Sequence, residues 1–134
     1  MDQIFVFLCR CLAKTGGFFG WDYEKASVYI CLHLWPLLCV TMAVVMLGFA
    51  VATSNPLWIT ACSIYAVTNA FGYWVVIRHY YPGTTKDIFQ RCRDDLIVIA
   101  ERWDTTYAVV NLIVYVLLFL AIMVFDVSLI ILML

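Results

Sequence analysis

The chain has 134 residues, of which 66% are hydrophobic and 13% are charged, with a net charge of -1 and a mean hydropathy of +0.97. A soluble domain is roughly half apolar and a quarter charged, and a chain of this length could not hide so much apolar surface in its own core. The composition therefore excludes a soluble globular domain and predicts an all-α integral membrane protein with one domain over residues 1–134. The near-zero net charge and the lack of any RNA- or DNA-reading motif exclude a nucleic-acid-binding protein.

Residues 1–26 are predicted to form an N-terminal segment with a helix that lies in the membrane interface. Its apolar stretch, IFVFLC, is short and is followed by Arg10, which is not typical of a cleaved secretory signal. At about 100° per residue the apolar and polar side chains fall on opposite sides, and Gly16-Gly17 is expected to end the helix. The apolar arc consists of Ile4, Phe5, Leu8, Cys11 and Leu12, and the polar side carries Gln3, Arg10 and Lys14.

The first predicted transmembrane helix covers residues 27–53. It exceeds the ~20 residues that cross a ~30 Å hydrocarbon layer, so its first part is expected to lie below the bilayer or to bend along it. Pro36 removes a backbone hydrogen bond and predicts a kink where this bend occurs. Counting back from the end of the helix places His33 and Trp35 at the inner membrane surface.

The second predicted transmembrane helix covers residues 57–77 and is joined to the first by the turn sequence TSNP. Lipid provides no hydrophobic force between helices, so contacts are expected at small and polar side chains. Such residues occur on two opposite sides, which predicts a middle helix, either between the other two spans or between one span and another copy of the chain. One side carries Thr60, Ser63, Ala66 and Ala70, and the other carries Ala61, Tyr65, Thr68 and Gly72.

A group of polar and basic residues follows the second span at the membrane surface. A helix N-terminus with cations beside it is a favourable place for a phosphate group. We expect lipid headgroups to contact this group, either as general structural lipid or through recognition of a specific lipid. The group consists of Arg78, His79, Thr84, Thr85 and Lys86.

Residues 84–104 are predicted to form a cytoplasmic amphipathic helix. Pro82-Gly83 breaks the preceding helix, and Thr84 with Asp87 makes a capping pair at the new start. The apolar side chains share an arc of about 100°, which predicts a docking surface for a partner or for the membrane. This face consists of Ile88, Phe89, Cys92, Leu96, Ile99 and Trp103.

The third predicted transmembrane helix covers residues 107–134 and carries three polar residues on one face, Asn111, Tyr115 and Asp126. They are predicted to form an intramembrane polar contact. If the crossing begins at the first residue of this range, Asp126 marks the outer surface; if the helix is shifted or tilted, Asp126 lies about two turns inside. Burial of an unpaired carboxylate costs ~2.5–3.5 kcal/mol even on the lenient insertion scale, which favours the surface placement.

All eight lysines and arginines lie before the first span or between the second and third. Positively charged loops are retained in the cytoplasm, so the N-terminus and the amphipathic helix are predicted to be cytoplasmic and the C-terminus to face out. The membrane expected is a plasma membrane or a bacterial inner membrane.

The sequence lacks a nucleophile elbow, a Gly-rich phosphate loop and an HExxH motif, so we expect no enzymatic activity and no cofactor. His33 and His79 lack the further ligands of a metal site, and the six cysteines are read as small hydrophobic residues. The favoured function is a non-enzymatic subunit, scaffold or immunity-type partner acting through helix contacts. Its expected partners are membrane lipid and another membrane protein or a second copy, with no small-molecule substrate identified. The alternative is an oligomeric channel or transporter component lined by Asn111, Tyr115 and Asp126.

Overall fold

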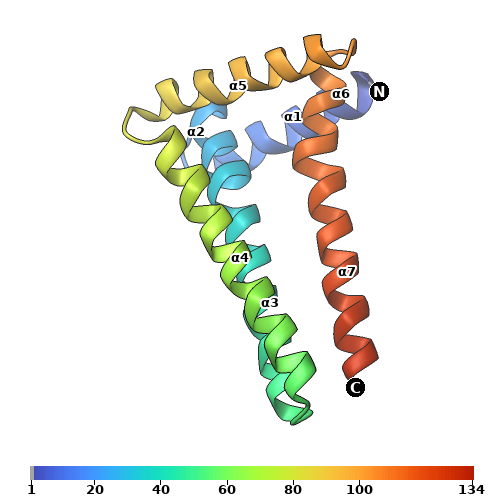
Figure 1. Cartoon of the computed structure of the whole chain (residues 1–134). Helices are drawn as coiled ribbons and strands as arrows, with labels where there is room; N and C mark the ends of the chain where they lie inside the picture. The colour runs from blue at the N-terminus through green and yellow to red at the C-terminus, as the bar shows by residue number, and fades with distance from the viewer. Residues whose placement is uncertain (1) are drawn as a thin grey trace.

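The structure is a computed structural model that describes residues 2–134, and its helices are joined by short turns (Figure 1). Three helices are long and apolar enough to cross a membrane: Tyr23–Ala52, Pro56–Tyr80 and Tyr107–Met133. The first long helix consists of α2 (Tyr23–Ser27), η1 (Val28–Leu34) and α3 (Trp35–Ala52), and the second is α4 (Pro56–Tyr80). The third consists of α6 (Tyr107–Leu112), η2 (Ile113–Leu117) and α7 (Leu118–Met133). The other two helices are α1 (Asp2–Phe18) and α5 (Thr85–Arg102).

Side chains that accept backbone hydrogen bonds mark where the helices begin. Asp22 accepts from the Lys25 N–H at 2.8 Å, and Asn55 accepts from the Leu57 N–H at 3.0 Å. These acceptors satisfy N–H groups that have no partner inside the first turn of a helix. The start of each long apolar helix therefore follows from short-range sequence signals.

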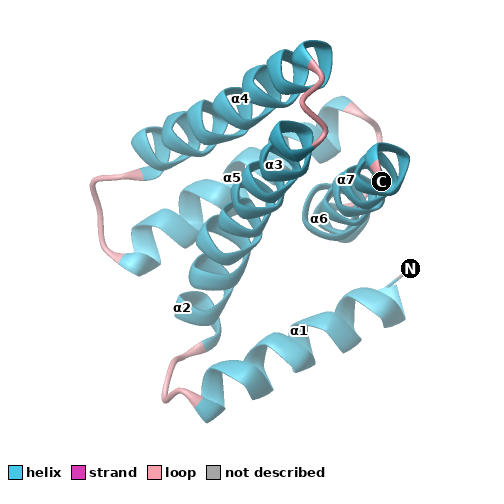
Figure 2. Ribbon diagram, turned by 90° about the horizontal axis from the view of Figure 1, so that it is seen from below, coloured by secondary structure: helices cyan, strands magenta, loops and turns pink. Residues whose placement is uncertain are grey.

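Helices α1 and α5 lie across one end of the long helices, as Figures 1 and 2 show. The basic side chains gather at this end, because they belong to α1, α2, α5 and the last turn of α4. The turn between α3 and α4 and the C-terminus lie at the opposite end (Figure 1). We call the first of these the basic end.

Helix α3, and not α4, occupies the middle of the bundle. It packs along α4 on one side and along α7 on the other (Figure 2). A cluster around the buried residues Met46, Ala50 and Cys62 joins the three helices at the end away from the basic residues. The predicted arrangement with the second span between the other two is therefore wrong, because the arc of α4 that contains Cys62 packs on α3. The alternative, in which the second span lies between one span and another copy of the chain, stays a prediction.

The N-terminal helix extends past the predicted stop at Gly16-Gly17 and ends at Phe18. Gly16 is buried where α1 approaches α2, and a Cβ atom placed there would lie 2.8 Å from the Cβ of Ala26. The glycine therefore permits close packing of two helices instead of ending one. The turn that follows uses Gly20, whose φ of +71° lies in the left-handed region.

The backbone before Pro36 takes the form of a π-helical stretch, η1. The Trp35 N–H bonds to the Ile30 carbonyl, five residues earlier. Proline has no N–H to continue the ordinary pattern, so a local change of hydrogen bonding here is expected. A second π-helical stretch, η2, occurs in the third long helix, where the Leu118 N–H bonds to the Ile113 carbonyl.

Candidate functional site

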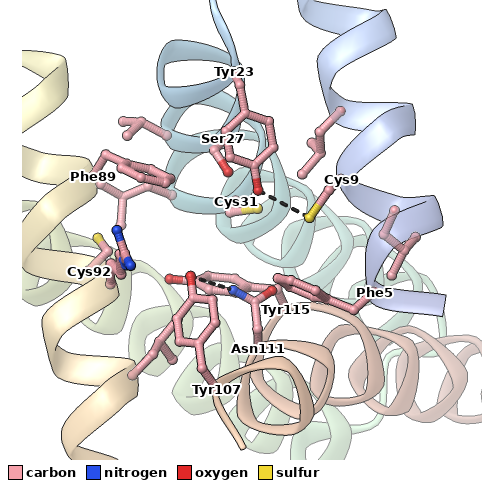
Figure 3. Close-up of a pocket in the computed structure, with 16 residues that line it drawn as sticks. Phe5, Cys9, Tyr23, Ser27, Cys31, Phe89, Cys92, Tyr107, Asn111 and Tyr115 are labelled. Atoms are coloured by element: carbon pink, nitrogen blue, oxygen red, sulfur yellow. Dashed lines mark hydrogen bonds between the residues drawn. The ribbon is translucent and has the colours of Figure 1, made fainter. Parts of the chain in front are cut away.

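A cavity of about 50 Å³ lies at the basic end, where α1, α2–η1, α5 and α6–η2 converge (Figure 3). This volume exceeds the ~10–15 Å³ that one buried water requires. Aromatic rings, thiols, hydroxyls and an amide all line it. The labelled residues around it are Phe5, Cys9, Tyr23, Ser27, Cys31, Phe89, Cys92, Tyr107, Asn111 and Tyr115.

Two hydrogen bonds form between side chains that line the cavity. The Cys9 thiol and the Tyr23 hydroxyl lie 3.3 Å apart and join α1 to α2, while the Asn111 amide donates to the Tyr107 hydroxyl at 3.2 Å within α6 (Figure 3). Among residues 2–134, no group of three or more His, Cys, Asp or Glu side chains has the arrangement of a metal site. The cavity therefore offers polar groups for hydrogen bonding.

Both π-helical stretches form part of this cavity. Cys31 and Leu32 come from η1, and Tyr115 comes from η2. A π-helical turn rotates the following side chains relative to an α-helix and occurs frequently at functional sites. The backbone hydrogen-bond pattern of both long helices therefore changes at the positions that line the cavity.

A wider vestibule of about 500 Å³ adjoins the cavity and shares six of its lining residues, Arg93 among them. It is a shallow depression that lies largely open at the protein surface. Arg93 of α5 and Glu24 of α2 bring opposite charges to its walls. The other lining residues are Phe5, Cys9, Tyr23, Phe89 and Tyr107.

Burial raises the pKa of the Cys92 thiol, on α5, to about 11, and the nearby Asp95 carboxylate adds to the effect. Its thiol is therefore neutral at ordinary pH and contributes a weak donor to the cavity wall.

Asp126 lies away from the cavity and is fully buried between the helices. The Tyr65 hydroxyl donates to its Oδ1 at 2.7 Å, whereas Oδ2 has no hydrogen-bond partner in the described chain. Asp126 is therefore enclosed by its own chain, while its depth in the membrane, at the outer surface or about two turns inside, stays a prediction. Asp126 is enclosed by Tyr65 of α4 and by the neighbouring helix α3. Counting residues along one helix could not predict these contacts.

The predicted polar set is divided in space. Asn111 and Tyr115 line the cavity, but Asp126 lies eleven residues beyond Tyr115, roughly 16 Å along a helix at ~1.5 Å per residue. Between them the Trp35 and Phe119 rings stack with centroids 5.6 Å apart. The expected single contact is therefore two separate polar regions with an apolar layer between.

The face of α5 predicted to dock a partner is largely covered by this chain. Ile88 and Leu96 are buried in two clusters that hold α5 to the long helices, and Phe89 and Cys92 line the cavity. Ile99 packs beside Leu96, and only Trp103 is exposed. The amphipathic pattern correctly identifies an inward face, but that face is occupied within the chain.

The predicted phosphate position at the start of α5 is occupied by an internal carboxylate. Asp87 Oδ2 accepts from both the N–H and the hydroxyl of Thr84, at 3.1 and 2.7 Å. These hydrogen bonds lower the pKa of Asp87, so the carboxylate carries a negative charge where a phosphate was expected. Of the other members, Arg78 lies over the Trp74 ring, His79 lies 3.7 Å from Asp95, and Thr85 and Lys86 form the first turn.

The small residues predicted for helix packing flank the arc of α4 that faces α3. Ser63, Tyr65 and Ala66 are half-buried at the edges of this contact. The hydroxyls of Thr60 and Thr68 donate to carbonyls of their own helix. The exposed members of the set are Thr60, Ala61, Thr68, Ala70 and Gly72.

His33 has a role that sequence reasoning missed. Its two ring nitrogens lie 3.0 Å from the hydroxyls of Tyr73 and Tyr81, which come from α4 and the segment after it. These tyrosines are 40 and 48 residues away in the chain, so no helical spacing indicates the contact. The same holds for Cys9, Tyr23 and Arg93, which meet only when four elements converge.

No protein-family model, curated protein or solved structure matches this chain.

Proposed function

We propose that this chain is a non-enzymatic multi-pass membrane protein that acts as a subunit, scaffold or immunity-type partner by accepting a transmembrane helix of another chain against α4. The observation that carries the proposal is an exposed stripe on α4, formed by Ala61, Thr68 and Gly72. A Cβ atom added at Gly72 would meet no atom within 4 Å. Small side chains let membrane helices approach closely, and this chain leaves these three uncovered.

The position of the stripe favours a helix as its occupant. Ala61, Thr68 and Gly72 lie on the same side of α4 as Tyr65, because they are spaced by three or four residues. Tyr65 contacts Phe125 and Asp126 of α7, so this side of α4 adjoins α7. A helix bound there would contact both α4 and α7. The second span would then lie between one span of its own chain and a helix of another chain, as in one of the two predicted arrangements.

We infer that the basic end faces the cytoplasm and that the C-terminus faces out, because the lysines and arginines gather at one end of the three long apolar helices. Helix α1 is proposed to lie along the membrane interface. Its Ile4 and Phe7 are 56% and 63% exposed, which suits contact with lipid, while Phe5, Leu8 and Leu12 line the cavity.

The division of the polar set supports this proposal over a channel. The channel alternative needs Tyr115 and Asp126 to line one continuous path, and the stacked Trp35 and Phe119 rings lie between them. Asp126 is also enclosed by its own chain, so several copies would not present it to a shared lumen.

Photo-crosslinking in the native membrane tests the proposal. A crosslinking residue at Thr68 should give an adduct with another chain, and Gly72→Leu should reduce that adduct at least severalfold by filling the stripe. Gly48→Leu on α3 is the matched control, since a Cβ at Gly48 also meets nothing within 4 Å. An adduct of twice the mass of the chain identifies a second copy, and another mass identifies a different protein. Lack of any protein adduct from Thr68 contradicts the proposal.

A further inference from the structure

Two opposite charges face the vestibule without neutralising each other. Arg93 lies on α5 and Glu24 on α2. Within residues 2–134, no lysine or arginine nitrogen lies within 4.0 Å of a carboxylate oxygen, so Arg93 and Glu24 do not form an ion pair. Each charge therefore remains available to a ligand.

Aromatic rings line the vestibule together with these charges. The Phe5 and Tyr107 rings meet edge to face with centroids 5.9 Å apart, and the Tyr23 and Phe89 rings do the same at 5.9 Å. The four rings come from α1, α6, α2 and α5 (Figure 3). Aromatic faces attract an ammonium group, and the attraction increases when water is excluded.

These groups together select for a ligand that carries both charges. A simple anion would be attracted by Arg93 and repelled by Glu24, and a simple cation would meet the reverse. A guanidinium binds phosphate through two parallel hydrogen bonds, while a carboxylate and aromatic faces suit an ammonium. We propose that the vestibule binds a zwitterionic phosphoethanolamine group, with its phosphate at Arg93 and its ammonium between Glu24 and the aromatic rings.

The location of the vestibule agrees with this ligand. It lies at the basic end, where the first and third long helices begin and where phospholipid headgroups contact basic side chains. The adjoining cavity of about 50 Å³ has room for water molecules, so the headgroup would occupy the vestibule and contact water held beneath it. The same chemistry is present in a membrane phospholipid and in a free phosphoethanolamine ester.

Native mass spectrometry of the purified full chain tests the lipid form. After incubation with equal amounts of phosphatidylethanolamine and phosphatidylglycerol, the unsubstituted chain should retain the first at least fivefold more. Glu24→Gln should abolish most of this preference, because only phosphatidylethanolamine carries an ammonium, and Arg93→Gln should reduce the retention of both lipids severalfold, because both carry a phosphate. Arg102→Gln, the same change on the same helix but outside the vestibule, should keep both the preference and the retention. Equal retention of the two lipids by the unsubstituted chain, an unchanged preference in Glu24→Gln, or unchanged retention in Arg93→Gln overturns the proposal.

Soluble glycerophosphoethanolamine distinguishes the two sources. If the free headgroup raises the unfolding temperature of the chain in detergent and Arg93→Gln removes the increase, the vestibule binds the soluble ester. If only the intact phospholipid binds with the Arg93 and Glu24 dependence, the ligand is a membrane lipid. Binding of neither overturns the proposal, and the circular dichroism of each variant shows whether its helices are intact. The result is independent of helix docking on α4, because the vestibule and the stripe lie on different elements.

Discussion

The Tyr65 hydroxyl donates to the Asp126 carboxylate at 2.7 Å and joins α4 to α7 beside the central helix α3. The two residues are 61 positions apart in the chain. Because Asp126 is fully buried and Oδ2 lacks a partner, this hydrogen bond is the single one that the described chain gives to its carboxylate. The contact therefore contributes to fixing the position of α7 against α4.

Tyr65→Phe should destabilise the folded chain by about 1–3 kcal/mol, since it leaves a buried carboxylate without any hydrogen bond. Tyr65→Phe combined with Asp126→Leu should be close to neutral or stabilising, because replacing both partners with apolar groups of similar size leaves neither one unsatisfied. Reversible unfolding in mild detergent measures both. A Tyr65→Phe chain as stable as the unsubstituted protein would show that the hydrogen bond contributes nothing.

The thiols should react at different rates. The pKa of Cys92 is raised from 9.0 to about 11, which lowers its thiolate population near pH 7.5 roughly a hundredfold. Maleimide labelling of Cys92 should therefore be much slower than that of the exposed Cys11 and should increase about tenfold per pH unit until the pH approaches 11. Mass spectrometry of peptides after a short pulse gives both rates. Equal labelling of the two thiols at pH 7.5 would contradict the burial of Cys92.

The proposed orientation can be tested with two engineered thiols. In a Cys11→Ser background, Ser54→Cys should react with an impermeant maleimide added outside intact cells, and Gln90→Cys should react only in inverted vesicles. The reason is that Ser54 lies in the turn between α3 and α4, whereas Gln90 lies on α5 at the basic end. If both thiols react from the same compartment, the three-crossing topology is incorrect.

Sequence alone determined the helical class, the three long apolar helices and the start of α5. These properties depend on local interactions: hydropathy over about twenty residues sets a membrane span, and Thr84 with Asp87 caps a helix three residues apart. The inward face of α5 could also be predicted, because Ile88 and Leu96 recur at helical spacing. In each case the residues that interact are close in the chain.

Only the tertiary structure decided what those helices contact. It placed α3 in the middle, covered the α5 face with the chain's own helices and separated Asp126 from Asn111 and Tyr115. It also brought Arg93 and Glu24 to one vestibule. Helical spacing tells which side chains share a face, but the neighbour of that face is chosen by the packing of all helices at once, between residues tens of positions apart.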